Sequence, residues 1–220
     1  MEWSILKNSV LSNSTLTGAM INSIVFSYQI AFFVALVDLI FGLPLGWAIT
    51  RGKFKGRQLV DTLLDMPLAL PTAATGFSTA IFWQQLTNTG NSFAIVSAIH
   101  IAISLPYMVR SVSAAIQELD VSYEIAARTL GASPRDVFFD IELPLSAKGI
   151  LTGAILCWAR AISEFGAVII LAYYPHTAPV LIYVRFETWG LSASKPISAL
   201  LLIVTLSIFI LLKYIEKKSD

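Results

Sequence analysis

An acid and a base lie one helical turn apart inside an apolar stretch of the chain, residues 150–173. Glu164 follows Ser163, and Arg160 precedes the acid by four residues, so both charges lie on one face of a helix. A carboxylate in a membrane-spanning segment is costly and is a functional candidate by default. Because the pair also neutralises part of its own charge, we expect it to fix neighbouring helices or a seam between subunits. A gate or pathway role is the alternative.

A row of hydroxyls follows Pro71 in an earlier apolar stretch, residues 59–83. Thr72, Thr75 and Thr79 recur at spacings of three and four residues, which places them on one face of a helix. Hydroxyls can donate hydrogen bonds to a passing oxyanion without a fixed charge that would trap it. Small hydroxyl residues also allow membrane helices to pack closely. The stripe therefore predicts either a lining for a polar solute or a packing face.

A third ionisable residue, Asp38, lies near the middle of the stretch 24–50. An acid at that depth costs roughly 2.5–3.5 kcal/mol unless it is paired or reached by water. Arg160 has a comparable expected depth and is our candidate partner for it. Elsewhere, no set of histidines or cysteines has metal-ligand spacing, and the phosphate-binding pattern G-x-x-x-x-G-K-[ST] is absent. The sequence thus predicts no metal site, no catalytic site and no ATP site in this chain.

A polar block, residues 121–144, separates two of the apolar stretches, and we call it the hook. Its main run reads EIAARTLGASPRDVFFDIELP. Residues 124–130 predict a short helix that begins at Glu124, and the adjacent Ala126 and Ala127 leave a shallow surface that a partner could cover. Gly131 is expected to end this helix, because glycine adopts the left-handed backbone conformation without a Cβ penalty.

The second half of the hook carries the signals of a new helix. Ser133 is a favourable cap, Pro134 suits the first helical position, and Asp136 is the acid three residues after the cap. Leu143-Pro144 is expected to stop this second helix. The hook is therefore predicted to consist of two helices joined by a glycine turn.

The composition is that of a membrane protein, because 56% of the 220 residues are hydrophobic and only 13% are charged. Five stretches are long enough to cross about 30 Å of hydrocarbon, at residues 24–50, 59–83, 93–116, 150–173 and 197–212. Each should be a helix, since a segment in lipid has to satisfy its own backbone. We expect one all-α integral membrane domain over residues 1–220, preceded at residues 1–21 by a short extracytoplasmic segment. The net charge of +1 gives no case for nucleic acid.

The cations are distributed unevenly among the connections between these stretches. Cytoplasmic connections of membrane proteins are enriched in Lys and Arg. The cations of one side are Arg51, Lys53, Lys55, Arg57, Arg110, Arg128, Arg135, Lys148, Lys213, Lys217 and Lys218, whereas the other side holds Lys7, Arg185 and Lys195. The N-terminus is therefore expected outside, and the hook and the C-terminus are expected in the cytoplasm.

The hook resembles the EAA loop of permease subunits in ATP-binding-cassette (ABC) importers. In that loop E-A-A precedes a glycine by four residues and ends in hydrophobic-x-Leu-Pro. Ile125 stands where the family has Glu, and Glu124 lies one residue earlier. The residues that match in register are Ala126, Ala127, Gly131, Leu143 and Pro144.

Other stretches extend the resemblance over roughly residues 25–212. WARAISEFGAVIILAYYP (158–175) and APVLIY (178–183) resemble the molybdate/tungstate permeases, archaeal ones in particular. TRGKFKGRQLVDTLLDMPLALPTAATG (50–76) resembles that group and also the sulfate permeases. The resemblance implies a type I ABC importer permease fold in the cell membrane, with the hook as the loop that couples to an ATPase.

The same resemblance implies partners and a mechanism. A homodimer would carry tungstate or molybdate by alternating access, driven by two separate ATPase subunits that hold ATP and Mg. An extracytoplasmic binding protein would dock on the outward loop, where Arg185 and Glu187 are contact candidates. No cofactor is expected on this chain, which should not itself be an enzyme.

Three alternatives differ in their sequence requirements. A sulfate or thiosulfate ABC permease is compatible with residues 50–76 but less so with residues 161–183. A secondary transporter would need coupling-ion sites, for which Asp38 and Glu164 are the clear buried acids, and would leave the hook without a purpose. A membrane enzyme would need a buried catalytic pair or a metal cluster.

Overall fold

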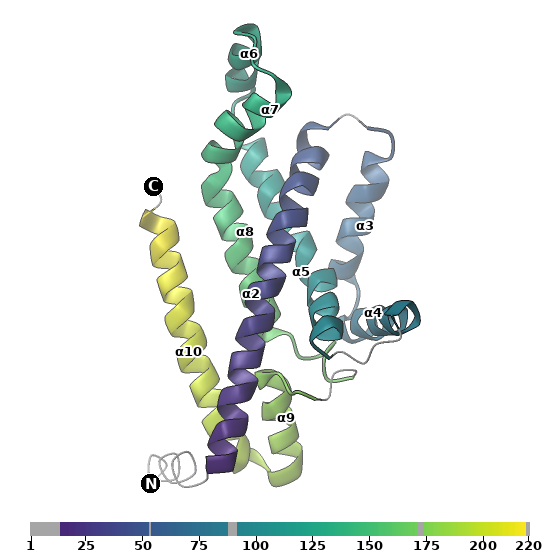
Figure 1. Ribbon diagram of the computed structural model, residues 1–220, viewed down its shortest axis with the longest axis vertical. Helices are drawn as coiled ribbons and strands as arrows, with labels where there is room; N and C mark the ends of the chain where they lie inside the picture. Colours follow the sequence, from purple (N-terminus) through teal and green to yellow (C-terminus); the bar gives the residue numbers. More distant parts are fainter. Residues whose placement is uncertain (1–13, 53, 88–91, 171–173, 219–220) are drawn as a thin grey trace.

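The computed structural model describes residues 14–52, 54–87, 92–170 and 174–218, and over those ranges the chain is helical without any strand. Three long helices form the body: α2 (Ser14–Arg51), α5 (Ser92–Gln117) and α8 (Leu143–Ser163). They pack against one another along the long axis, and α10 (Leu191–Lys218) flanks them on one side (Figure 1). The predicted all-α class is confirmed.

Small residues allow the body helices to approach closely. A Cβ added at Gly46 of α2 would lie 2.8 Å from the side chain of Val112 on α5, and one at Gly42 would lie 2.5 Å from Met108. Helices in lipid associate through such close van der Waals contacts, because the lipid tails are as apolar as the side chains and no hydrophobic effect drives the helices together. The interior of the body is filled by apolar side chains, among them the fully buried Val34 and Val96.

Four helices are long and apolar enough to cross a membrane among the described residues. They cover Thr17–Arg51, Phe93–Gln117, Pro134–Ser163 and Leu191–Lys217. The chain is therefore a multi-pass membrane protein. The predicted stretches 24–50, 93–116 and 197–212 each lie inside one of these helices.

The predicted span at residues 59–83 is wrong as a single helix. It is divided into α3 (Arg57–Ala69) and α4 (Thr72–Thr87), with Leu70 extended at φ −88° and ψ 146°. The residue before a proline is pushed out of the helical region by the proline ring, and Pro71 follows Leu70 directly. Figure 1 shows the result, with α3 along the long axis and α4 running across it.

The predicted span at residues 150–173 is displaced toward the N-terminus. A three-residue helix, α7 (Pro134–Asp136), continues as the π-helical η1 (Val137–Glu142) and then as α8, which ends at Ser163. The expected helix stop at Leu143-Pro144 is therefore wrong: both residues lie in the first turn of α8. A proline in the first turn costs little, because its missing N–H has no helical partner there.

The hook and the N-terminal end of α2 lie at opposite ends of the molecule (Figure 1). Residues 14–21 of the predicted N-terminal segment are helical and continuous with α2, whereas residues 1–13 and Lys53 lie outside the described residues. The predicted outward connection contains a helix, α9 (Ala178–Trp189), near that N-terminal end. The fold thus places the two sets of predicted contact residues at opposite ends.

Candidate functional site

The first helix of the hook, α6 (Val121–Thr129), is held by local hydrogen bonds at both ends. At its start, Asp120 Oδ1 accepts a hydrogen bond of 2.8 Å from the amide of Ser122, and this bond holds the pKa of Asp120 below its usual range. At its end, Gly131 has φ +91°. The amide of Ala132 donates to the Ala127 carbonyl and that of Gly131 to the Arg128 carbonyl, each at 3.0 Å, which is a Schellman motif. The predicted stop at Gly131 is confirmed.

The second helix of the hook starts as the sequence predicts. Ser133 Oγ accepts from the amide of Asp136 at 3.3 Å, and Asp136 Oδ2 accepts from the amide of Ser133 at 2.8 Å. This reciprocal pair is a capping box, and Pro134 occupies the first helical position. The turn between the two helices is therefore fixed on both sides by short-range bonds.

The outer surface of the hook is exposed and partly apolar. No residue of α6 is buried; Ile125 is 61% exposed and Leu130 is 89% exposed. Ala126 is exposed and Ala127 half-buried, and Glu124 forms an ion pair of 2.8 Å with Arg128 along the helix. Figure 1 shows α6 and α7 projecting beyond the end of the body. Apolar side chains gathered on a projecting polar element indicate a surface for another protein.

At the base of the hook, a carboxylate that sequence reasoning missed joins three elements. Glu142, 3% exposed, accepts a 2.8 Å bond from Arg51 Nε and a 2.6 Å bond from Trp47 Nε1. Arg51 Nη2 also donates to the Ile116 carbonyl at 3.3 Å. We call Trp47, Arg51, Glu142 and the Ile116 carbonyl the Glu142 cluster. It connects the ends of α2 and α5 to the junction between the hook and α8.

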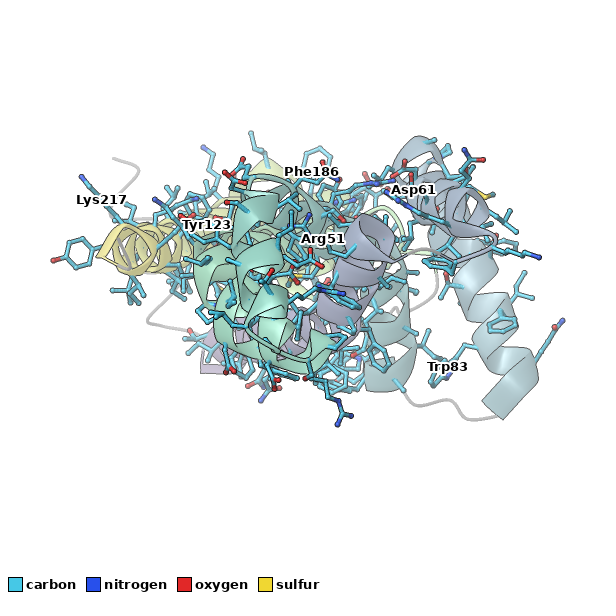
Figure 2. The ribbon with its side chains drawn as sticks, turned by 90° about the horizontal axis from the view of Figure 1, so that it is seen from above. Arg51, Asp61, Trp83, Tyr123, Phe186 and Lys217 are labelled. Atoms are coloured by element: carbon cyan, nitrogen blue, oxygen red, sulfur yellow. The ribbon has the colours of Figure 1, made fainter. Side chains whose placement is uncertain are left out.

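A cavity of about 330 Å³ lies next to this cluster. Trp47 and Arg51 line it from the body, and Val121, Glu124, Arg128, Pro134 and Glu142 line it from the hook. Figure 2 looks along the bundle from the hook end and places Arg51 near the centre of the view, with Lys217 and Trp83 at opposite sides. The cavity therefore lies between the hook and the end of the body, near the centre of the view along the bundle.

The predicted pair at the far end of α8 forms an ion pair. Arg160 Nη2 lies 2.6 Å from Glu164 Oε2, and Glu164 Oε1 accepts a bond of 2.9 Å from the amide of Ala167. Glu164 is 3% exposed but lies just past the helix, as its extended C-cap, rather than within it. Ser163 is exposed and donates to the Arg160 carbonyl at 3.0 Å. The pair thus fixes the turn that follows α8.

The predicted pairing of Asp38 with Arg160 is wrong. Asp38 is fully buried and accepts a hydrogen bond from Ser104 on α5, while Arg160 pairs with Glu164. The thiol of Cys157 on α8 donates to the Ser104 carbonyl at 3.3 Å. The polar group at Asp38 therefore joins the three body helices.

The threonine stripe lies beside the turn that contains Glu164. The hydroxyls of Thr75 and Thr79 donate to carbonyls one turn earlier, at 3.4 and 2.8 Å. A Cβ added at Gly166 would lie 2.9 Å from Thr72 Oγ1. On the same helix, a Cβ at Gly76 would lie 2.5 Å from Ala167. The structure brings α4 and the Glu164 turn together, and the threonines are half-buried there.

A comparison with protein families identifies the chain. The family model described as "Binding-protein-dependent transport system inner membrane component" matches residues 38–220. This chain belongs to that family of ABC importer permeases.

Relatives of this permease carry two kinds of name. The molybdate/tungstate transport system permease protein WtpB of Pyrococcus abyssi is 39% identical over 191 residues, covering 84% of this chain and 74% of that protein. The protein of the same name from Methanocaldococcus jannaschii is 39% identical, over 81% of this chain and 74% of that one. The sulfate transport system permease protein CysT of Synechocystis sp. is 31% identical, over 87% and 73%. The resemblance drawn from the motifs is confirmed.

A solved structure shares the fold of the permease. A chain of the MetNI methionine ABC transporter in an inward-facing crystal form superposes with a TM-score of 0.82, covering 94% of this chain and 99% of that chain. Their sequences are 17% identical, so the match concerns the fold alone. It confirms the predicted type I importer permease fold.

The two residues predicted as outward contacts, Arg185 and Glu187, both lie on α9. Arg185 is half-buried, with its guanidinium carbon 4.9 Å from the centre of the Trp189 ring, and Glu187 is exposed. Nearby, burial and the positive charge of Arg185 lower the pKa of His176. The permease therefore presents a small aromatic and charged surface at the end opposite the hook.

A second ionic contact that sequence reasoning missed holds α3. Arg110 on α5 lies 2.7 Å from a carboxylate oxygen of Asp61 and 2.7 Å from one of Asp65. None of the residues of α3 is buried, and this contact joins it to α5. The signal available in the sequence was the four-residue spacing of the two acids, together with an arginine in another apolar stretch.

Proposed function

We propose that this permease forms the membrane path of an ATP-driven importer for tungstate or molybdate. The assignment of these anions as the cargo rests on the similarity to permeases named for them, at 37–39% identity. Two separate ATPase subunits would bind ATP and Mg, and an extracytoplasmic protein would deliver the anion. This chain supplies no ATP-binding pattern of its own.

The hook is the proposed contact with the ATPase. Its exposed Ala126, half-buried Ala127 and apolar neighbours provide a surface that a groove could cover closely, and Gly131 sets its direction. Glu124 supports the helix through Arg128. Leu143 and Pro144 carry the junction with α8, whose first turn they occupy. Closure of the ATPase pair on ATP would move α6 and open the path outward beneath a loaded binding protein. Hydrolysis of ATP would then return the path to its inward-facing state.

A second copy of the chain is part of the proposal. Apolar side chains fill the space between α2, α5 and α8, so an anion path within one copy would need that core to open. A path between two copies leaves both cores intact. Our candidates for the lining or gate of this path are the half-buried Thr72, Thr75 and Thr79 and the turn with Arg160, Ser163 and Glu164.

Few fixed charges are proposed to touch the anion in transit. Arg160 is already paired with Glu164, which leaves backbone groups and hydroxyls as the main donors. Thr75 and Thr79 would have to turn from the carbonyls to which they now donate. Weak donors let an anion leave as well as enter. Selection would therefore reside mainly in the binding protein, with Arg185 and Glu187 of α9 as its docking contacts.

Sulfate is the second candidate cargo, because permeases named for sulfate are 30–31% identical to this chain. ATPase activity in liposomes separates the two. The complex of this chain with its ATPase and binding protein is supplied with tungstate, molybdate or sulfate separately. Stimulation by the first two alone supports the proposal; stimulation by sulfate alone reverses the cargo, and stimulation by none of the three contradicts it.

A further inference from the structure

The first helix of the hook, α6, has little apolar packing through which a movement could reach the membrane helices. None of its residues is buried, and a cavity of about 330 Å³ lies between it and the body. A movement of α6 could push on the membrane helices only through direct contact, because dense packing is what transmits strain through a protein. The connection between α6 and the body therefore runs through the chain on either side of it, through Val137 and Phe138 of η1, which pack at the end of the body, and through the polar contacts of Glu142.

Glu142 is placed to make that connection. One carboxylate oxygen binds Arg51 and the other binds Trp47, so both acceptors are committed to the last two turns of α2. Through its second nitrogen group, Arg51 also binds the Ile116 carbonyl near the end of α5. The backbone of Glu142 is fixed as well, because its carbonyl accepts a 2.6 Å bond from Ser146 on α8. A displacement of Glu142 therefore acts on α2, α5 and α8 together.

The backbone at this point has an unusual geometry. η1 ends at Glu142, and the amide of the next residue, Leu143, donates to the carbonyl of Phe138, five residues earlier. Short π-helical stretches within α-helices occur frequently at functional sites, because they interrupt the regular ladder and re-aim side chains. Here the wider turn lies between the part of the helix that belongs to the hook and the part that crosses the membrane.

We infer that Glu142 is the positioning residue that transmits movement of the hook to α2 and α5. The inference rests on the proposed ATP-driven function and adds a named residue to it. When the ATPase moves α6, the η1 segment turns, and the Glu142 carboxylate carries the ends of α2 and α5 with it. The cavity beneath the hook provides the room for this movement. Without the carboxylate, ATP is still hydrolysed, but the path does not open in step.

The test measures anion accumulated per ATP hydrolysed in proteoliposomes that contain this chain, its ATPase and its binding protein. The anion is whichever of tungstate, molybdate or sulfate the unaltered complex accumulates. Glu142→Gln replaces one acceptor oxygen by a donor, so one of the two N–H groups loses its partner. Trp47→Phe removes the Nε1 donor and part of the ring volume, and it keeps an aromatic ring beside Phe138, whose centroid lies 5.5 Å from that of Trp47.

Glu216→Gln is the matched control. Glu216 is a carboxylate 8% exposed near the end of α10, bound to Lys213 at 2.6 Å and to Thr152 of α8, and it does not line the cavity under the hook. We expect the ratio to fall on the order of tenfold in Glu142→Gln, within the range of coupling between sites. A smaller fall is expected in Trp47→Phe and none in Glu216→Gln, with ATPase binding retained in all three.

A ratio is used because loss of folded complex lowers uptake and hydrolysis together and leaves it unchanged. An unchanged ratio in Glu142→Gln overturns the inference, as does an equal fall in the control. If Glu142→Gln does not assemble, Trp47→Phe decides by the same criterion. If the unaltered complex accumulates no anion with ATP, the proposed function itself fails, which is a different result.

Discussion

The turn at Gly131 gives a prediction whose size follows from the backbone alone. A Cβ added there meets nothing within 4 Å, so a substitution costs packing nothing and acts only through the φ of +91°. An ordinary L-residue pays about 1–2 kcal/mol in the left-handed region. That cost shifts the balance between the native turn and alternatives by a factor of about 5–30.

Three substitutions at Gly131 separate backbone strain from other effects. Asparagine tolerates the left-handed conformation, alanine does so poorly, and valine resists it most because of its β-branch. Affinity for a partner falls in proportion to the fraction of molecules that are competent to bind. We therefore expect the apparent Kd for the ATPase to rise by up to about 5–30-fold for Gly131→Ala and further for Gly131→Val. Gly131→Asn should stay near the unaltered chain.

The assay is a titration of the ATPase onto the permease in nanodiscs, with the amount of folded permease held equal. Valine that binds like glycine would refute the reasoning, since the positive φ would then not matter for the hook. Asparagine as weak as alanine would also refute it, because the order would no longer follow backbone preference.

The remaining predictions concern three other local contacts. Asp65→Asn removes one of the two carboxylates that hold Arg110, at a cost of about 0.2–1 kcal/mol for such a part-exposed pair, and a spin label on α3 should become more mobile. Gly76→Val should clash with Ala167, which an added Cβ would approach to 2.5 Å, and lower stability by about 1–3 kcal/mol in thermal unfolding of the solubilised chain. The third is a pH effect. The pKa of Asp120 is lowered by the amide that it caps, so its contribution is complete above the unfolded value of about 3.9 and is lost as pH falls through the lower folded value. Protection of the α6 amides from exchange, relative to the intrinsic rate at each pH, should fall over that acidic range and should lose this pH dependence in Asp120→Asn. An unchanged label, an unchanged melting temperature or a pH-independent protection would contradict the respective prediction.

Local chemistry made the turn in the hook predictable, whereas the expected helix start at Glu124 was wrong, because α6 begins at Val121 with Asp120 as its cap. The left-handed glycine, the capping box and the proline at the second helix start all depend on residues within a few positions of one another. Hydropathy predicted a membrane-spanning helix correctly only where the apolar stretch coincided with an unbroken helix. Hydropathy averages over Pro71, and so the break between α3 and α4 was lost although the proline itself indicated it.

The contacts that join the helices could not be read from the chain. Glu142 and Arg51 are 91 residues apart, and Arg110 and Asp65 are 45 apart. Their pairing depends on how far each helix extends and on its rotation, which periodicity leaves open. The wrong partner for Asp38 has the same origin. An approximate depth in the membrane could be estimated from the sequence for Asp38 and Arg160, but the rotation of α8 about its axis could not.

ATP-dependent accumulation of tungstate inside proteoliposomes tests the central claim most directly. The vesicles contain this chain with its ATPase and binding protein, and a matched set carries a chain in which residues 124–131 are replaced by a flexible linker. We predict accumulation that requires both ATP and the intact hook. Accumulation without ATP that survives replacement of the hook would contradict the account and indicate a transporter driven by an ion gradient.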